Sequence, residues 1–409
     1  MPGSLHAAGY GTMVALVVFL IGSVWLGTLA QRSIREGSFL QGYFLGNRGL
    51  GTWALALTAT VQSGGTFMGY PSLVYSYGWI VALWIAGYMV VPITGFGVLA
   101  KRVAQLSRRT GAITVPDLFR ERFNSPTAGL ISSLLILFVM SFMMVAQFKA
   151  GATIMKVVWP AQEAAAASEA TPAAVAEADE TKPIDWLFLS GLAIFAVTVV
   201  GYTMIGGFLA AVWTDLFQSV LMWVGVMILL ALTLWHVGGI ETATRGAVAK
   251  TGPEFAAGPG FSPDGRHFLT SGLAASFFFL WVYSGIASPA GVVRLMACKD
   301  TQTIRRSIFA LAVYNMMIYI PLLIICVAAR SVLPTLQASD EVVPRMALWT
   351  TQDMRGGSLI AGLVLVAPFG AVMATVSAYL VVIASGIVHD VYQRFLRPEA
   401  GVREIRVVT

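Results

Sequence analysis

The feature that most constrains this chain is a succession of long apolar runs separated by short polar segments. Each run is long enough to cross the hydrocarbon core of a bilayer, which is about 30 Å thick and takes about 20 helical residues to span. The runs fall at residues 9–30, 51–72, 77–100, 128–157, 185–208, 210–237, 269–297, 306–332 and 358–388. Only 11% of the residues are charged, against about 25% in an ordinary soluble domain. The pattern predicts an all-α polytopic membrane protein.

Several functional classes are disfavoured by what the sequence contains and lacks. The net charge of +6 does not indicate a nucleic-acid partner, because the basic residues sit in short loops between apolar runs. The sequence has no P-loop, no HExxH and no paired-cysteine metal spacing. No segment assembles a nucleophile with a base, so we do not expect an enzyme.

Lysine and arginine are concentrated in alternate connecting segments. Residues 31–50, 101–126 and 294–306 and the C-terminal tail hold 17 of the 26 basic residues. Because short loops rich in Lys and Arg stay on the cytoplasmic side, the pattern predicts a multi-pass protein of the cell (inner) membrane with its N-terminus outside and its C-terminus cytoplasmic. Residues 159–184 are alanine-rich and acidic, and we expect them to form a flexible external loop.

Two of the expected spans contain residues that interrupt a helix. The stretch LTATVQSGGTFMGYP at 57–71 has paired glycines and many hydroxyl groups, and the run at 269–297 has Gly285, Pro289 and Gly291 near its middle. Interrupted spans in corresponding positions of two halves are typical of inverted-repeat transporters, whose half-helix ends and freed carbonyls face ions and substrates. The alternatives are a glycine-mediated helix contact at the first stretch and two unrelated kinks.

Four stretches of the chain carry a family likeness. They are SGGTFMGYP (63–71), ITVPDLFRERFN (113–124), IGGFLAAVWTDLFQ (205–218) and the region 371–397, which ends in HDVYQRFLRP. These residues and their spacing resemble the sodium/solute symporter family, relatives of bacterial proline, pantothenate and sugar symporters. The resemblance implies a core of two inverted five-helix repeats, alternating access and coupling to sodium.

The resemblance also implies how the chain is divided. We expect a single membrane domain over 1–409, with an extra N-terminal helix at 9–30, the first five-helix repeat at 51–237 and the first three helices of the second repeat at 269–392. The family's second repeat needs two more core helices, and this chain stops where the next one would begin. We therefore expect a fragment truncated at the C-terminus, unless the remaining surface is supplied by something else.

A sodium site between the first interrupted helix and the eighth core helix is implied by the same resemblance. Matching the motifs places carbonyl ligands at Ala59 and Gln62, and partners at the Ala371 carbonyl and at positions 374 and 375, which share one helix face. Thr375 offers a hydroxyl, whereas Ala374 stands where the family normally has a serine. A neighbouring hydroxyl or water completing the shell, weak sodium binding and another coupling ion are the alternatives. The Thr375 hydroxyl has its own alternative, a bond to a carbonyl of its own helix.

Candidate contacts to the solute lie at both interruptions and in one span. They are Ser63, Gly65, Thr66, Lys149, Tyr283 and Ser284. An ammonium inside a span is a functional hypothesis by default, so we expect Lys149 to pair with a solute carboxylate, unless it snorkels to the outer interface. Sugar-transporting members have Gln and Glu where this chain has Thr66 and Ile85, which favours a small carboxylate or an amino acid over a sugar.

Two further residues complete the expectations. Asp215 matches a family residue near the inner exit path of the ion, although a carboxylate is also favoured at a helix N-terminus for electrostatic reasons. Arg294, at the end of the 269–297 run, is expected to anchor at the cytoplasmic interface. The function expected is sodium-coupled symport of a small organic solute across the lipid bilayer. The alternative is a transporter-like sensory input module of a signalling protein, because similar helical domains are fused to histidine kinases.

Overall fold

A computed structural model of the chain describes residues 9–31, 39–59, 63–159, 185–258, 269–336 and 338–408. The regular elements of these residues are helices, and an isolated parallel bridge joins Leu50 to Cys298. The predicted all-α class is therefore confirmed. The expected external loop at 159–184 falls almost entirely outside the described residues.

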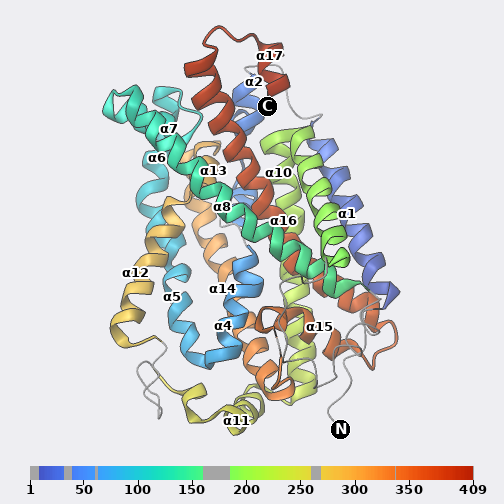
Figure 1. Ribbon diagram of the computed structural model, residues 1–409. Helices are drawn as coiled ribbons and strands as arrows, with labels where there is room; N and C mark the ends of the chain where they lie inside the picture. The colour runs from blue at the N-terminus through green and yellow to red at the C-terminus, as the bar shows by residue number, and fades with distance from the viewer. Residues whose placement is uncertain are drawn as a thin grey trace, which may run out of the picture.

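The long helices form an elongated bundle with shorter elements at its two ends (Figure 1). The bundle contains α1 (Tyr10–Gln31), α3 (Thr52–Thr58), η2 (Gly65–Gly69), α4 (Tyr70–Tyr77), η3 (Gly78–Ile80), α5 (Val81–Val91), η4 (Pro92–Ala100), α8 (Pro126–Val158), α10 (Trp186–Val237), α12 (Ser271–Ala287), α13 (Pro289–Met296), α14 (Thr301–Val332), α16 (Gly357–Ser385) and η7 (Gly386–Leu396). One end carries α2 (Phe39–Leu45), η1 (Gly46–Arg48), α6 (Lys101–Thr110), α7 (Val115–Phe123) and α17 (Val402–Val408). The other end carries α11 (Ile240–Thr251), η5 (Pro253–Ala256), η6 (Ser339–Glu341) and α15 (Val342–Thr351).

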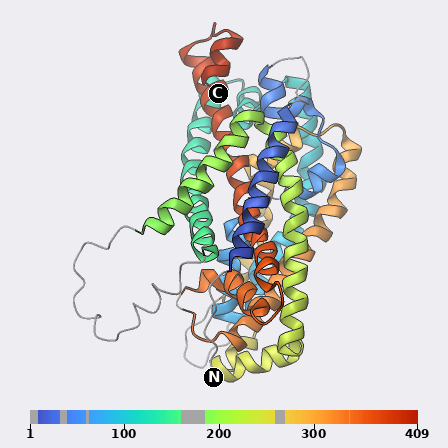
Figure 2. The same cartoon turned by 90° about the vertical axis from the view of Figure 1, so that its right-hand side faces the viewer.

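The expected spans map onto fewer continuous helical runs. Six runs among the described residues are long and apolar enough to cross a membrane, and the bent pair α12–α13 makes a seventh. Helix α10 has 52 residues, which at 1.5 Å per residue would extend about 78 Å, more than twice the hydrocarbon thickness. It reverses at Gly207, and Figure 2 shows its green and yellow-green limbs diverging from one end of the bundle. Helix α10 therefore supplies two of the expected spans.

The reversal in α10 requires a glycine. Gly207 has a φ of +55°, a region that side chains other than glycine rarely adopt, and a Cβ there would lie 2.7 Å from the carbonyl oxygen of Tyr43. The Tyr43 hydroxyl donates to the Met204 carbonyl at 3.1 Å, close to the reversal. The motif IGGFLAAVWTDLFQ thus marks the point where the chain turns back.

The basic segments gather at one end of the bundle. The amide of Leu50 donates to the Ala297 carbonyl at 3.0 Å, and Arg108 donates to the Cys298 carbonyl at 2.8 Å. Arg48 donates to the Ala112 carbonyl at 3.0 Å. Helix α17, near the C-terminus, lies at this end (Figure 1). The positive-inside rule requires the basic connecting segments to lie at the same end of the bundle, as they do here. That this end faces the cytoplasm stays a prediction.

Helix α16 runs through the centre of the molecule. It packs against α1, α8 and α10, and 22 of its 29 residues are buried. A helix that is apolar all round is expected in such a position. The centre of α16, which holds residues 371–377, is therefore enclosed by other helices.

Candidate functional site

The first interruption lies between α3 and η2. Helix α3 ends at Thr58, and helical structure is present again from Gly64. Ser63 caps the second half, because its Oγ accepts from the Gly65 amide at 3.1 Å and its carbonyl accepts from the Thr66 amide at 2.9 Å. In return, the Ser63 amide donates to Thr66 Oγ1 at 3.4 Å. Three of the predicted solute contacts therefore build the end of a half-helix.

Two neighbouring helices hold this half-helix in place. The Gly64 amide donates to Gln147 Oε1 of α8 at 2.9 Å, and Thr66 Oγ1 is 3.0 Å from the Tyr319 hydroxyl of α14. Gln147 is only 8% exposed. Sequence reasoning missed Gln147, although an amide side chain inside an apolar span was a signal that could have found it.

Lys149 occupies a different face of α8 from Gln147. Two residues along a helix correspond to about 200° of rotation, and the Lys149 side chain is exposed whereas Gln147 is buried. The ammonium thus points away from the first interruption. This position favours the alternative in which the side chain snorkels along the outside of the bundle.

The second interruption lies at Ser288. Helix α12 ends at Ala287, α13 begins at Pro289, and the two helix axes are bent by 42°. Ser288 itself has a φ of −56° and a ψ of 120°, outside the helical region. The predicted break at Pro289 is therefore confirmed.

A cavity of about 420 Å³ lies beside the second interruption. Ser284, Ser288 and Pro289 line it from the break, Met140 and neighbouring apolar residues line it from α8, and Tyr379 lines it from α16. Tyr283 is 67% exposed and is absent from this lining. Of the two residues predicted at this break, Ser284 alone lies in the cavity wall.

The expected sodium ligands lie on two elements. Ala59 follows the last residue of α3, and a Cβ on Gly291 of α13 would lie 3.4 Å from the Ala59 carbonyl oxygen. Ala371, Ala374 and Thr375 are all buried on α16. The Thr375 hydroxyl donates to the Ala371 carbonyl at 3.0 Å, which is the local bond foreseen as its alternative. Gln62 lies outside the described residues.

A buried ion pair lies next to the α16 residues. Arg294 of α13 donates to Asp215 of α10 at 2.5 Å, and both side chains are at most 3% exposed. Ser377 donates to the second carboxylate oxygen at 3.1 Å, and the Arg294 Nε donates to Thr58 Oγ1 at 3.2 Å. The expectation that Arg294 anchors at an interface is wrong, because Asp215 supplies the counter-charge that lets the guanidinium be buried.

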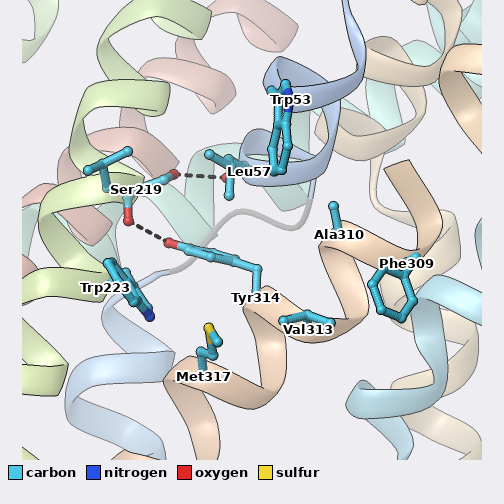
Figure 3. A pocket seen from close by; sticks show the side chains of 10 residues that line it. Trp53, Leu57, Ser219, Trp223, Phe309, Ala310, Val313, Tyr314 and Met317 are labelled. Carbon is cyan, nitrogen blue, oxygen red and sulfur yellow. Dashed lines mark hydrogen bonds between the residues drawn. The ribbon is translucent and has the colours of Figure 1, made fainter. Parts of the chain in front are cut away.

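The last turn of α3 is also tied to α10 and α14. Figure 3 shows Ser219 donating to the Leu57 carbonyl at 2.8 Å, and the Tyr314 hydroxyl donating to the Ser219 carbonyl at 3.0 Å. The adjoining pocket has a volume of about 300 Å³ and is lined mainly by apolar side chains such as Trp53 and Met317. The Ser219 bond satisfies a carbonyl in the last turn of α3, while the apolar wall offers few ligands for an ion.

Comparisons with known proteins identify the family of the chain. The chain matches the model of the sodium:solute symporter family over residues 43–166 and 182–409. It is 30% identical to a sodium/pantothenate symporter of Haemophilus influenzae, over 97% of this chain and 75% of that protein. It is 25% identical to the osmoregulated proline transporter OpuE of Bacillus subtilis, over 97% and 74%.

A solved structure shows the same fold. It is a Na⁺-coupled sialic acid symporter in a substrate-bound, outward-open state, which aligns with a TM-score of 0.72 and 19% identity over 98% of this chain and 77% of that one. The fold is consistent with the inverted-repeat core that the sequence predicted. The relatives are transporters rather than enzymes, as expected. The chain belongs to the sodium:solute symporter family and is a multi-pass membrane transporter.

Proposed function

We propose that the protein imports a small organic solute together with sodium by alternating access. The observation that carries the proposal is the pair of helix interruptions, one after α3 and one at Ser288, which adjoin each other where Gly291 of α13 lies beside the Ala59 carbonyl. Interrupted backbone at membrane depth is tolerated where it lines a cavity or is buried in protein. In an inverted-repeat transporter the two interruptions form the binding region.

The orientation we propose follows from the charge pattern. The end that carries α2, α6, α7 and α17 faces the cytoplasm, and the N-terminus lies outside the cell (inner) membrane. Three basic connecting segments meet at this end through the bonds of Leu50, Arg48 and Arg108. Positive charge retained on the cytoplasmic side supports this assignment.

Sodium in our proposal bridges the end of α3 and the middle of α16. The ligands are the carbonyls of Ala59, Gln62 and Ala371 and the hydroxyl of Thr375, because hard cations prefer oxygen. The Ala371 and Thr375 oxygens are 3.0 Å apart and can face one ion. Ala374 contributes no side-chain oxygen, so water completes the shell. A bound cation would favour the conformations in which α3 and α16 are close.

The release path for sodium in our proposal runs past Asp215. Both carboxylate oxygens are engaged, one by Arg294 and one by Ser377. Sodium leaving toward the basic end must therefore compete with the guanidinium for the carboxylate. The pair would act as a barrier that opens together with the inner half of the bundle.

The solute class we favour is a small carboxylate or amino acid. The cavity of about 420 Å³ suits a small organic molecule. Ser288, which precedes α13, and Pro289, its first residue, lie in the wall, so the N-terminal end of that helix, which favours negative charge, faces the cavity. The relatives described as pantothenate and proline transporters make those two solutes the first to test.

The proposal is tested by uptake into proteoliposomes. Pantothenate and proline are supplied with an inward sodium gradient or with the same gradient of potassium. We expect uptake of one of them only with sodium. Thr375→Ala should raise the sodium concentration for half-maximal uptake by about tenfold or more, because one ligand is lost.

Thr350 gives a matched control. It is fully buried in α15, and its hydroxyl bonds to the carbonyl four residues earlier at 2.8 Å, as that of Thr375 does. Thr350→Ala should leave the sodium dependence unchanged. Uptake that is indifferent to sodium, or an equal effect of both substitutions, contradicts the sodium assignment.

A further inference from the structure

A second polar cluster lies at the basic end of the bundle, away from the helix interruptions. Asp117 of α7 accepts from His389 Nε2 at 3.0 Å and from Arg394 Nη2 at 2.7 Å, both on η7. Its carboxylate also accepts from the Ile113 amide at 3.2 Å. Asp117 is 3% exposed, so its charge is held inside the joint between α7 and η7.

A cavity of about 520 Å³ opens beside this joint. Its polar wall consists of Arg120, His389, Gln393 and Arg394, and Pro126 and Phe395 are among its apolar residues. The two carboxylates of the cluster, Asp117 and Asp390, are absent from the wall and buried. The groups that face the cavity are therefore basic or neutral, with the negative charges behind them.

Arg120 has hydrogen-bond donors without an acceptor among the described residues. Its Nε and Nη2 are buried and unpartnered, and its Nη1 lies 3.7 Å from Asp117 Oδ1. The side chain is 11% exposed and lies against Gly129, where a Cβ would be 3.0 Å from Nε. Buried guanidinium donors are normally satisfied, and a planar fork of N–H groups matches the oxygens of a phosphate or carboxylate.

We propose that this cavity binds a phosphate group, either as the free ion or as the headgroup of an anionic phospholipid. Arg120 and Arg394 hold the phosphate oxygens, and the Gln393 amide donates from the same wall. His389 keeps Gln393 in place, because its Nδ1 bonds to Gln393 Oε1 at 2.9 Å while its Nε2 bonds to Asp117. A metal ion suits the cluster less well. Asp117, His389 and Asp390 are close enough to share one, but both oxygens of Asp117 are already bonded to His389 and Arg394. The site is independent of the transported solute.

The two sources of phosphate are separated by thermal unfolding of the full chain. One arm adds inorganic phosphate, with chloride at equal ionic strength as the reference, to protein in neutral detergent. The other arm compares nanodiscs of phosphatidylcholine with nanodiscs that also contain phosphatidylglycerol. We expect the melting temperature to rise by about 2–4 °C in at least one arm, because a ligand that binds the folded state stabilises it.

The variant Arg120→Gln should abolish this rise. The matched control is Arg122→Gln, which removes the same charge from an exposed position of α7. Arg120→Lys keeps the charge beside Asp117 but loses the fork, and it should lose most of the rise even if Arg120→Gln does not fold. A rise with phosphate alone identifies the free ion, and a rise with phosphatidylglycerol alone identifies the lipid. No rise in either arm, or an equal rise in the Arg120 variants, overturns the proposal.

Discussion

Asp215 and Asp117 are both buried carboxylates paired with an arginine, but their surroundings differ. Asp215 lies among the central helices, and its partner Arg294 is 3% exposed. Asp117 lies at the basic end, shares its charge between His389 and Arg394, and Arg394 is 38% exposed. Removing one member of the central pair leaves an isolated charge inside the bundle, whereas groups at the end can be rehydrated. The difference shows that the same ion pair has a different cost of disruption at the two depths.

The largest effect is expected for the central pair. Arg294→Met leaves the Asp215 carboxylate buried without its counter-charge and should lower the free energy of unfolding by about 3–5 kcal/mol. Thermal or denaturant unfolding of the full chain in detergent measures the loss.

A double variant distinguishes charge from packing at this pair. Asp215→Asn combined with Arg294→Met removes both charges, so it should be more stable than Arg294→Met alone. A double variant that loses the sum of the two single effects would show that the pair is not energetically coupled and would remove the contrast with Asp117.

A smaller and pH-dependent effect is expected for Asp117. Burial raises its pKa, but the hydrogen bond from His389 and the charges of His389 and Arg394 outweigh burial and lower the pKa from 3.8 to about 2. A lowered pKa stabilises the folded state above pH 4, and this contribution, about 2 kcal/mol, is lost as the pH falls towards 2. Unfolding of the wild type and of Asp117→Asn at pH 5, 4, 3 and 2 measures it.

Comparison with Asp117→Asn isolates the contribution of the Asp117 charge to stability between pH 5 and pH 2. The stability difference between the wild type and Asp117→Asn should shrink as the pH falls through this range, because the asparagine does not titrate. The exposed Glu121, on the same helix, gives the control Glu121→Gln. A constant difference between the wild type and Asp117→Asn down to pH 2 contradicts a stabilising charge at Asp117.

The smallest effect is expected for Lys149. Its side chain is exposed, so Lys149→Gln should change the free energy of unfolding by no more than about 0.5 kcal/mol and should leave the apparent solute affinity unchanged. Uptake and unfolding of the same preparation check both points. A marked loss of solute affinity would return Lys149 to the binding region and contradict its position on the outer face of α8.

The parts of the structure that depend on local sequence were predictable. Apolar length predicted the spans, and Pro289 predicted the second interruption, because both act through the residue's own backbone. The Asp215–Arg294 pair joins residues 79 positions apart, and the bond from Arg394 to Asp117 spans 277 positions. Composition does not reveal such partners, so Arg294 was assigned to an interface.

Some residues of the candidate site were predicted and others were missed, because their roles depend on contacts that the sequence does not show. Lys149 drew attention because a charge in an apolar span is conspicuous, yet the neighbouring Gln147 holds the half-helix. A neutral amide becomes informative only when its rotation towards the bundle is known. The motifs at 113–124 and 371–397 were recognised as family marks, and the structure shows that both contribute to the Asp117 cluster.

The bond from the Gly64 amide to Gln147 allows opening of the core to be followed by amide hydrogen exchange. This amide stands at the start of a half-helix, and among the described residues its acceptor is Gln147 Oε1 of α8. Any rearrangement that moves the half-helix away from α8 exposes the amide proton to deuterium in the solvent. The hydrogen–deuterium exchange rate of the peptide that contains Gly64 therefore reports how often the half-helix separates from α8. Gln147→Leu should raise this exchange rate while leaving the amides of the α16 centre protected.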